Sequence, residues 1–129
     1  MSLPALLEHS VGEVDGRTSL FAQRCRRCGR IAFPVRSLCA ACGADELDRV
    51  PLSPDGQVFS WTVIHRAAAG WQVPYVVALV DFPEGPRLFA QVRADPAAMR
   101  SGMPVRLVFG TPPAGRPDGA YYFEPRSGT

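Results

Sequence analysis

The chain has 129 residues, 47% of them hydrophobic, and a formal net charge of +2; this allows one or two small domains with a real core and does not by itself indicate nucleic-acid binding. No apolar run approaches the roughly 20 residues needed to span a membrane, and residues 1–10 lack the basic start and long apolar centre of a signal peptide. We therefore expect a cytoplasmic protein with reduced cysteines.

Residues 1–16 are predicted to be a leader, in which Leu3 to His9 favours one or two helical turns, while Gly12 and Gly16 end anything longer. Residues 17–50 are predicted to form a zinc ribbon with short strands at 19–24, 30–33 and 46–50. Pro34 ends the second of these strands because proline has no N–H to donate. So small a unit buries little surface, so we expect a metal to supply much of its stability.

The ribbon is organised around the four cysteines of the chain, which form two C-x2-C pairs separated by ten residues, each followed at once by glycine. Such a turn aims two thiolates at one point, and the glycine lets the backbone fold around a metal. The spacing and the glycines favour a structural site for zinc or, less often, iron over two disulfides or a redox motif. Four thiolate ligands also argue against a catalytic zinc, which usually keeps one position open for water. The predicted ligands are Cys25, Cys28, Cys39 and Cys42.

All basic residues of the chain are arginines, and six of them lie between Gly16 and Ala44, where no acidic residue occurs. One interpretation is that they are solvated and offset the negative charge of a metal bound by four thiolates. The other is that some of them bind phosphate, which the planar guanidinium does well. Arg26 and Arg27, inside the first cysteine pair, are the candidates for phosphate binding.

Residues 51–129 are predicted to be mostly β-structure, with a turn at 51–56 and strands at 57–66, 75–82, 87–93, 104–109 and 120–123. In the first of these strands, Phe59, Trp61 and Val63 are expected to share one face. Between the third and fourth strands we expect one or two helical turns, with Asp95 as the N-cap and Gly102 as the stop signal.

Five strands with one small helix in this position are typical of an OB-fold, a partly open Greek-key barrel, although a generic small barrel or half of a β-sandwich would give similar strands. The fold prediction is thus a mainly β protein. It has an N-terminal rubredoxin-like zinc ribbon followed by a five-stranded OB-fold barrel with one short helix.

The sequence offers few groups for catalysis. There is no lysine for a Schiff base, and assigning the four cysteines to metal leaves no thiol nucleophile. His65, at a strand end, is more often a packed or capped residue than a base, and no serine or carboxylate is visibly spaced to partner it. We therefore predict that this chain alone contains no catalytic residues.

Several segments together resemble the zinc-ribbon-plus-OB-fold proteins associated with acyl-CoA enzymes. The resemblance begins at the first C-x2-C-G and continues through Phe33-Pro34 to the second C-x2-C-G. In the barrel it takes in residues 59–66, 73–80, 84–88 and 102–105, so that it covers about residues 17–110 in order. One departure is a shorter, less helical N-terminal segment than family members often carry.

The resemblance implies a small accessory subunit in a hetero-oligomer with a thiolase-superfamily enzyme, which itself holds the catalytic groups for thiolysis, acyl transfer or aldol cleavage. It also implies a contribution to a coenzyme A or acyl-CoA site. Trp71 and Tyr75, between the first two barrel strands, lie where OB-folds bind ligands, and they could stack on adenine or pack at a protein interface. The candidate coenzyme A contacts are Arg26, Arg27, His65, Trp71 and Tyr75.

We expect docking on the partner through the ribbon and the loop from Ala67 to Pro74, which is too apolar for a purely solvated connection. The alternative function is a nucleic-acid-binding module, since zinc ribbons and OB-folds also serve that role. Residues 51–129 carry seven arginines against six acidic residues, and this near-neutrality disfavours a groove that tracks phosphates. A stand-alone enzyme is disfavoured by the missing catalytic groups.

Overall fold

The structure, a computed structural model, describes residues 10–114 and 121–126 and begins with a hairpin of β1 (Val11–Val14) and β2 (Arg17–Cys25). Asp15 and Gly16 connect the two strands with φ of 51° and 79°, the left-handed pair that two-residue hairpin turns need. β1 lies within the segment predicted to be a leader, and the Asp-Gly dipeptide that follows it is a strong hairpin signal. The helical turns expected at 3–9 lie outside the described residues.

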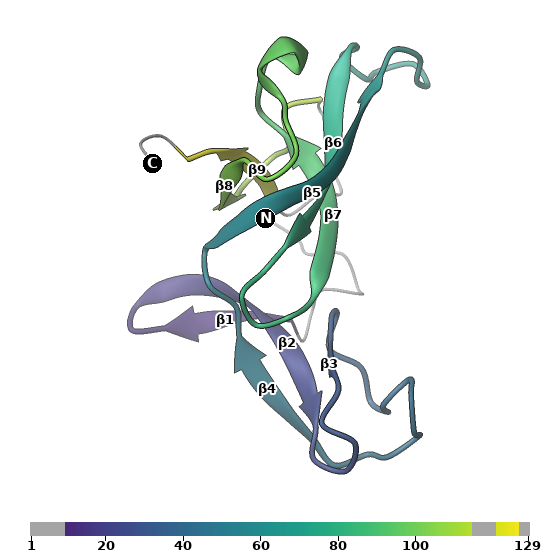
Figure 1. Cartoon of the computed structure of the whole chain (residues 1–129), viewed down its shortest axis with the longest axis vertical. Coiled ribbons are helices and arrows are strands. Elements are labelled where there is room, and N and C mark those ends of the chain that lie inside the picture. Colours follow the sequence, from purple (N-terminus) through teal and green to yellow (C-terminus); the bar gives the residue numbers. More distant parts are fainter. Residues whose placement is uncertain (1–9, 115–120, 127–129) are drawn as a thin grey trace.

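The ribbon is a four-stranded sheet in which β2 pairs with β1, with β3 (Ile31–Ala32) and with β4 (Leu47–Pro51). All of these pairings are antiparallel. The three predicted ribbon strands are confirmed, each within a few residues of its expected bounds. Figure 1 shows the ribbon below the barrel, with the turn after β2 at the lower end of the molecule.

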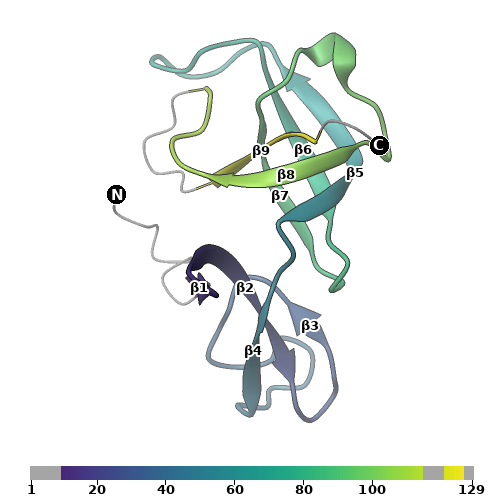
Figure 2. The ribbon, with the colours of Figure 1, turned by 90° about the vertical axis from the view of Figure 1, so that its left-hand side faces the viewer.

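The remaining strands close into a barrel in the order β5-β6-β7-β9-β8, which confirms the predicted five-stranded fold (Figure 2). All neighbours are antiparallel except β7 and β9, which pair in parallel at Val92 and Phe123 and so close the barrel. The barrel strands are β5 (Asp55–Ile64), β6 (Tyr75–Asp81), β7 (Arg87–Val92), β8 (Pro104–Phe109) and β9 (Tyr121–Pro125).

The helix of one or two turns predicted between β7 and β8 is a single 3-10 turn, η2 (Pro96–Ala98). Asp95 caps it as expected, because its Oδ1 accepts a hydrogen bond of 2.9 Å from the Ala97 N–H. The chain then becomes extended at Met99, whose side chain is buried in the barrel core, so the helix ends well before Gly102. Within the described part of the chain, no helix has the length and apolarity needed to cross a membrane.

A β-bulge overturns the expected common face of Phe59, Trp61 and Val63. Val58 pairs with Val80 and Ser60 pairs with Leu79, so Phe59 is an extra residue in β5. Because the bulge shifts the two-residue period, Trp61 and Val63 pack on the core beside Val58, whereas Phe59 is 50% exposed.

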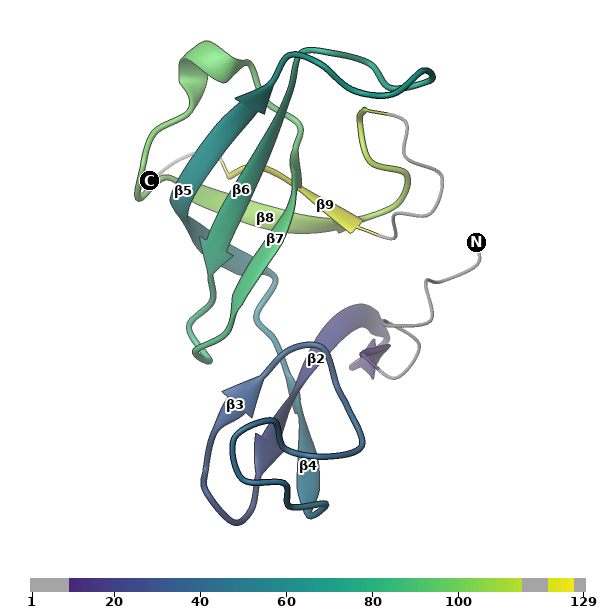
Figure 3. The same cartoon turned by 90° about the vertical axis from the view of Figure 1, so that its right-hand side faces the viewer.

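The ribbon and the barrel share one hydrophobic core. Leu20 and Ala22 of β2 are fully buried in the same cluster as Val80, Leu88 and Phe123 of the barrel. The Leu52 N–H also donates a 2.8 Å hydrogen bond to the Leu20 carbonyl. Figure 3 shows the ribbon sheet against the end of the barrel at which β6 turns into β7.

Candidate functional site

The four cysteines converge at the end of the ribbon. Their Sγ atoms all lie within 4.8 Å of one another, and the Cys25–Cys42 and Cys28–Cys39 pairs are each 3.6 Å apart. A tetrahedral zinc site with Zn–S bonds of about 2.3 Å has sulfur–sulfur edges of about 3.8 Å, whereas a disulfide bond is about 2.05 Å long. The arrangement therefore fits one metal ion bound by four sulfurs and does not contain a disulfide.

Both cysteine pairs have the same backbone geometry. Gly29 donates a 2.8 Å hydrogen bond to the Cys25 carbonyl, and Gly43 donates one of the same length to the Cys39 carbonyl. The two glycines have φ of 79° and 77°, a conformation that a residue with a Cβ rarely adopts. Open space surrounds the position of a Cβ at both glycines, so the positive φ, and not a clash, is what favours glycine here.

Backbone N–H groups inside these turns favour the thiolate form that a metal needs. The Cys28 N–H, 3.4 Å from the Cys25 sulfur, lowers the pKa of Cys25 against the opposing effect of burial. The N–H groups of Cys42 and Ala41 likewise lower the pKa of Cys39 to about 6. For Cys42 the lowering by the Ala44 N–H is outweighed by hydrogen bonding to the Cys25 thiol and by burial, so its pKa rises to about 11.

Arg26 and Arg27 lie on the exposed first turn of the ribbon. Nε and Nη2 of Arg26 donate hydrogen bonds of 2.9 and 2.7 Å to Oδ1 of Asp48, and Arg26 thereby lowers the pKa of the Asp48 carboxyl. Within residues 10–114 and 121–126, no acidic group is found in an ion pair with Arg27. The predicted basic patch is thus partly neutralised by a carboxylate from β4.

At the other end of the molecule, Trp71 and Tyr75 stack with ring centroids 5.3 Å apart and an angle of 20° between their planes. Tyr75 also lines a pocket of about 400 Å³ at the mouth of the barrel. His65 follows the last residue of β5 and is exposed, and it is absent from the pocket wall. The walls comprise Gln72, Pro74, Tyr75, Val76, Val92, Arg93, Ala94, Asp95, Pro113 and Ala114.

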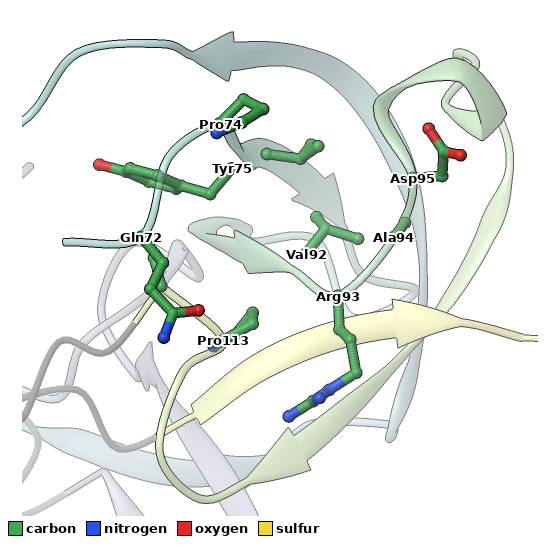
Figure 4. A pocket seen from close by; sticks show the side chains of 10 residues that line it. Gln72, Pro74, Tyr75, Val92, Arg93, Ala94, Asp95 and Pro113 are labelled. Carbon is green, nitrogen blue, oxygen red and sulfur yellow. The ribbon is translucent and has the colours of Figure 1, made fainter.

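The pocket carries one cation, Arg93, and one carboxylate, Asp95, whose Oδ1 accepts a hydrogen bond from the Ala97 N–H. Figure 4 shows Gln72, Pro74 and Tyr75 on one side and Val92 and Arg93 on the other. The Arg93 guanidinium lies 5.0 Å from the centre of the Tyr122 ring and donates a 3.3 Å hydrogen bond to its hydroxyl. These contacts hold the guanidinium at the pocket rim, where it can meet an anion.

Arg93 was not among the predicted site residues, although a signal for it existed. Pairing Asp81 with Arg87 across the turn sets the register of the β6–β7 hairpin, which brings Val76 opposite Val92. If this pairing continues by one more residue, Arg93 lies opposite Tyr75. The signal was therefore the position of Arg93 relative to the hairpin turn, which places it beside a predicted site residue.

The predicted contact residues do not form one site. Figure 1 places the loop between β5 and β6 at the upper end of the molecule and the turn after β2 at the lower end. Trp71 and Tyr75 are therefore together, whereas Arg26 and Arg27 lie on a separate surface. The expected docking face, which joined the ribbon to the loop from Ala67 to Pro74, is likewise split between two ends.

A four-cysteine ribbon joined to a five-stranded OB-fold barrel defines the class as zinc-ribbon–OB-fold proteins. Two family models match this chain in order: the rubredoxin-like zinc ribbon domain of ChsH2 over residues 16–48 and the C-terminal OB-fold domain of ChsH2 over residues 49–110. The chain belongs to this ChsH2 family, which confirms the resemblance inferred from the sequence.

Among its relatives, the benzoylsuccinyl-CoA thiolase subunit BbsA of Thauera aromatica is 38% identical over 109 residues, covering 84% of this chain and 74% of BbsA. A DUF35 domain-containing scaffold protein of Methanocaldococcus jannaschii is 35% identical over 100 residues, and the matched region covers 74% of this chain and 71% of the scaffold protein. Among solved structures, a chain of the Ltp2-ChsH2(DUF35) aldolase superposes with a TM-score of 0.69 and 34% identity, covering 83% of this chain and 84% of that one. The chain is therefore related to subunits of thiolase and aldolase complexes.

Proposed function

We propose that this chain is a non-catalytic accessory subunit of a thiolase-like enzyme and works in a hetero-oligomer with the subunit that carries the catalytic groups. The observation that carries the proposal is the similarity, over both domains, to a benzoylsuccinyl-CoA thiolase subunit. The similarity to a chain of an aldolase complex supports it independently. The cysteine spacing, which suits a bound metal better than disulfides, makes a cytoplasmic complex our expectation.

The ribbon would serve this function as a rigid platform. A structural zinc ion held by the four cysteines fixes the two turns, and β2 connects these turns to the barrel core through Leu20 and Ala22. A partner that contacts either part would thereby meet a preformed surface, which lowers the entropic cost of association.

We further propose that the pocket at the mouth of the barrel holds part of an acyl-CoA. Arg93 can pair with a phosphate through its planar guanidinium, and the stacked rings of Trp71 and Tyr75 offer a surface for adenine. Pro74 and Pro113, which also line the pocket and are not buried, offer apolar surface to an alkyl chain or the pantetheine arm. Phosphate binding by Arg26 and Arg27 stays a prediction for a separate contact, as does any role for the exposed His65.

The subunit role is tested by co-expressing this chain with a thiolase-superfamily protein encoded by the same organism and measuring the mass of the purified complex by light scattering. We expect a complex of fixed stoichiometry. Two separate species at micromolar concentration, for every such thiolase-superfamily protein, would refute the subunit role.

The ligand role is tested by titrating coenzyme A into that complex by calorimetry. Arg93→Ser and Tyr75→Ser should each weaken binding, while the control Arg106→Ser, on β8 and outside this pocket, should not. Coenzyme A binding that is equal in the parent and in both pocket variants would place the ligand elsewhere.

A further inference from the structure

The outer face of β5, β6 and β7 is apolar at its centre. Residues paired directly across a sheet point to the same side, and Leu79 pairs with Ser60 on one side and with Phe89 on the other. Two residues along β6, Val77 pairs with Thr62 and with Gln91, whose side chain is buried because its Oε1 accepts a 2.8 Å hydrogen bond from the Ala114 N–H. Val76, Ala78 and Val80 point into the core, so this set points outward. We call the surface of Phe59, Thr62, Val77, Leu79 and Phe89 the outer sheet face.

Two large side chains on this surface are exposed to solvent. Phe89 is 61% exposed and Phe59 is 50% exposed because the bulge in β5 turns it outward. Outward positions of a barrel strand usually carry polar or charged residues, since water covers them. Two exposed phenylalanines around a leucine are typical of a contact surface.

Charge is nearly absent from this side of the barrel. From Gln57 to the end of β5, and throughout β6 and β7, the only charged residues are Asp81 and Arg87. These two neutralise each other, because Nε of Arg87 lies 2.6 Å from Oδ1 of Asp81. The same guanidinium lies 3.5 Å from the centre of the Phe59 ring, so the pair is held at the edge of the outer sheet face.

The opposite side of the barrel is built differently. Arg106 of β8 pairs in register with Glu124 of β9, and Arg106 and Arg126 both lie within 4 Å of the Asp55 carboxylate. Charges are thus concentrated on β8 and β9, whereas the outer sheet face has a neutral aromatic centre. This asymmetry determines which kind of surface can cover each side.

We propose that the outer sheet face is the surface on which the catalytic partner subunit docks, through an apolar area of that partner that carries no net charge. The proposal rests on the proposed function. A partner charge placed here would lose its water without gaining an unpaired counter-charge, since Arg87 and Asp81 already neutralise each other. An apolar partner surface instead buries Phe59 and Phe89, and large aromatic side chains are typical anchors of interfaces.

The position of this face relative to the barrel-mouth pocket supports the same occupant. Along β6 the outward residues are Tyr75, Val77 and Leu79, and Tyr75 also lines the pocket. A subunit seated on Val77 and Leu79 therefore lies next to one wall of the pocket. The catalytic subunit and a ligand held near Arg93 are thereby brought together.

The test uses the full chain and the thiolase-superfamily protein that forms a complex with it. Phe89→Arg puts a charge beside Leu79 on the outer sheet face and should weaken the complex about 30-fold, as expected for an aromatic anchor. The matched control is Leu38→Arg on the ribbon, because Leu38 is also apolar and is 54% exposed. Phe89→Ser, which adds no charge, should weaken the complex in the same direction and to a smaller extent.

Circular dichroism and thermal melting of each free variant show whether it is folded. If Phe89→Arg binds like the parent, or if only Leu38→Arg weakens binding, the docking face is wrong and the subunit role stands. If the parent itself binds no thiolase-superfamily protein, the subunit role fails and this proposal fails with it. If the free chain is a dimer by light scattering and Phe89→Arg makes it monomeric, the occupant is a second copy of this chain, which also overturns the proposal.

Discussion

Replacing Leu20 by alanine should destabilise the barrel even though Leu20 belongs to the ribbon. Leu20 is fully buried among barrel residues, and its carbonyl accepts a hydrogen bond from Leu52 at the entrance to the barrel. Truncating a buried leucine to alanine removes transfer free energy and leaves a cavity, at a cost of about 3 kcal/mol. With an m value of about 1.5 kcal/mol/M, the urea midpoint should fall by about 2 M.

The assay can follow the two parts of the chain separately. Both tryptophans, Trp61 and Trp71, belong to the barrel part of the sequence, so their fluorescence reports barrel unfolding. Release of the metal to a chelating dye reports opening of the ribbon. For Leu20→Ala, both signals should shift together to lower urea concentration.

The matched control is Leu38→Ala, because Leu38 is a ribbon leucine with 54% exposure. It should change the free energy of unfolding by less than about 0.5 kcal/mol. If Leu20→Ala shifts metal release and leaves the fluorescence midpoint of the parent unchanged, the ribbon and the barrel do not unfold as one unit.

Three further predictions concern the metal, a crowded glycine and a surface ion pair. Protein purified without chelator should contain about one zinc per chain by elemental analysis, and Cys28→Ser should lose it and lower the melting temperature; a fully folded, metal-free parent with free thiols would contradict this. Gly56→Ala should cost about 1–3 kcal/mol of unfolding free energy, because its Cβ would lie 2.6 Å from Val80; an unchanged urea midpoint would show that the barrel adapts. Arg26 holds the pKa of the Asp48 carboxyl below its ordinary value of 3.8, so the ion pair stabilises the fold above about pH 4 and loses this effect as the pH falls further. The difference in melting temperature between the parent and Asp48→Asn should therefore be smaller at pH 3 than at pH 7. An equal difference at both pH values would contradict this assignment.

The cluster of four cysteines could be predicted from the sequence because its geometry is local. Two C-x2-C turns, each followed by a glycine at positive φ, already determine where the sulfurs point, and Asp95 determines a cap in the same local way. The strand order of the barrel followed from the number and spacing of strands and the position of the short helix.

The features that could not be predicted depend on contacts between distant parts of the chain. The bulge at Phe59 is a property of the pairing between β5 and β6, and a period-two reading of β5 alone places that residue on the wrong face. The ion pair of Arg26 with Asp48 needs β2 beside β4, so counting charges along the ribbon overestimated its basic patch. The shared core depends on how the ribbon sheet packs against the barrel.

The most direct test of the subunit role is the rate of acyl-CoA turnover by the catalytic partner as this chain is titrated into it. We predict that the rate rises to a plateau at a fixed ratio of the two proteins and that this chain alone gives no turnover. Cys28→Ser, which removes a predicted metal ligand, should reach that plateau only at higher concentration or not at all. A partner rate that does not change on addition of this chain, or turnover by this chain alone that survives His65→Ala, would contradict the account.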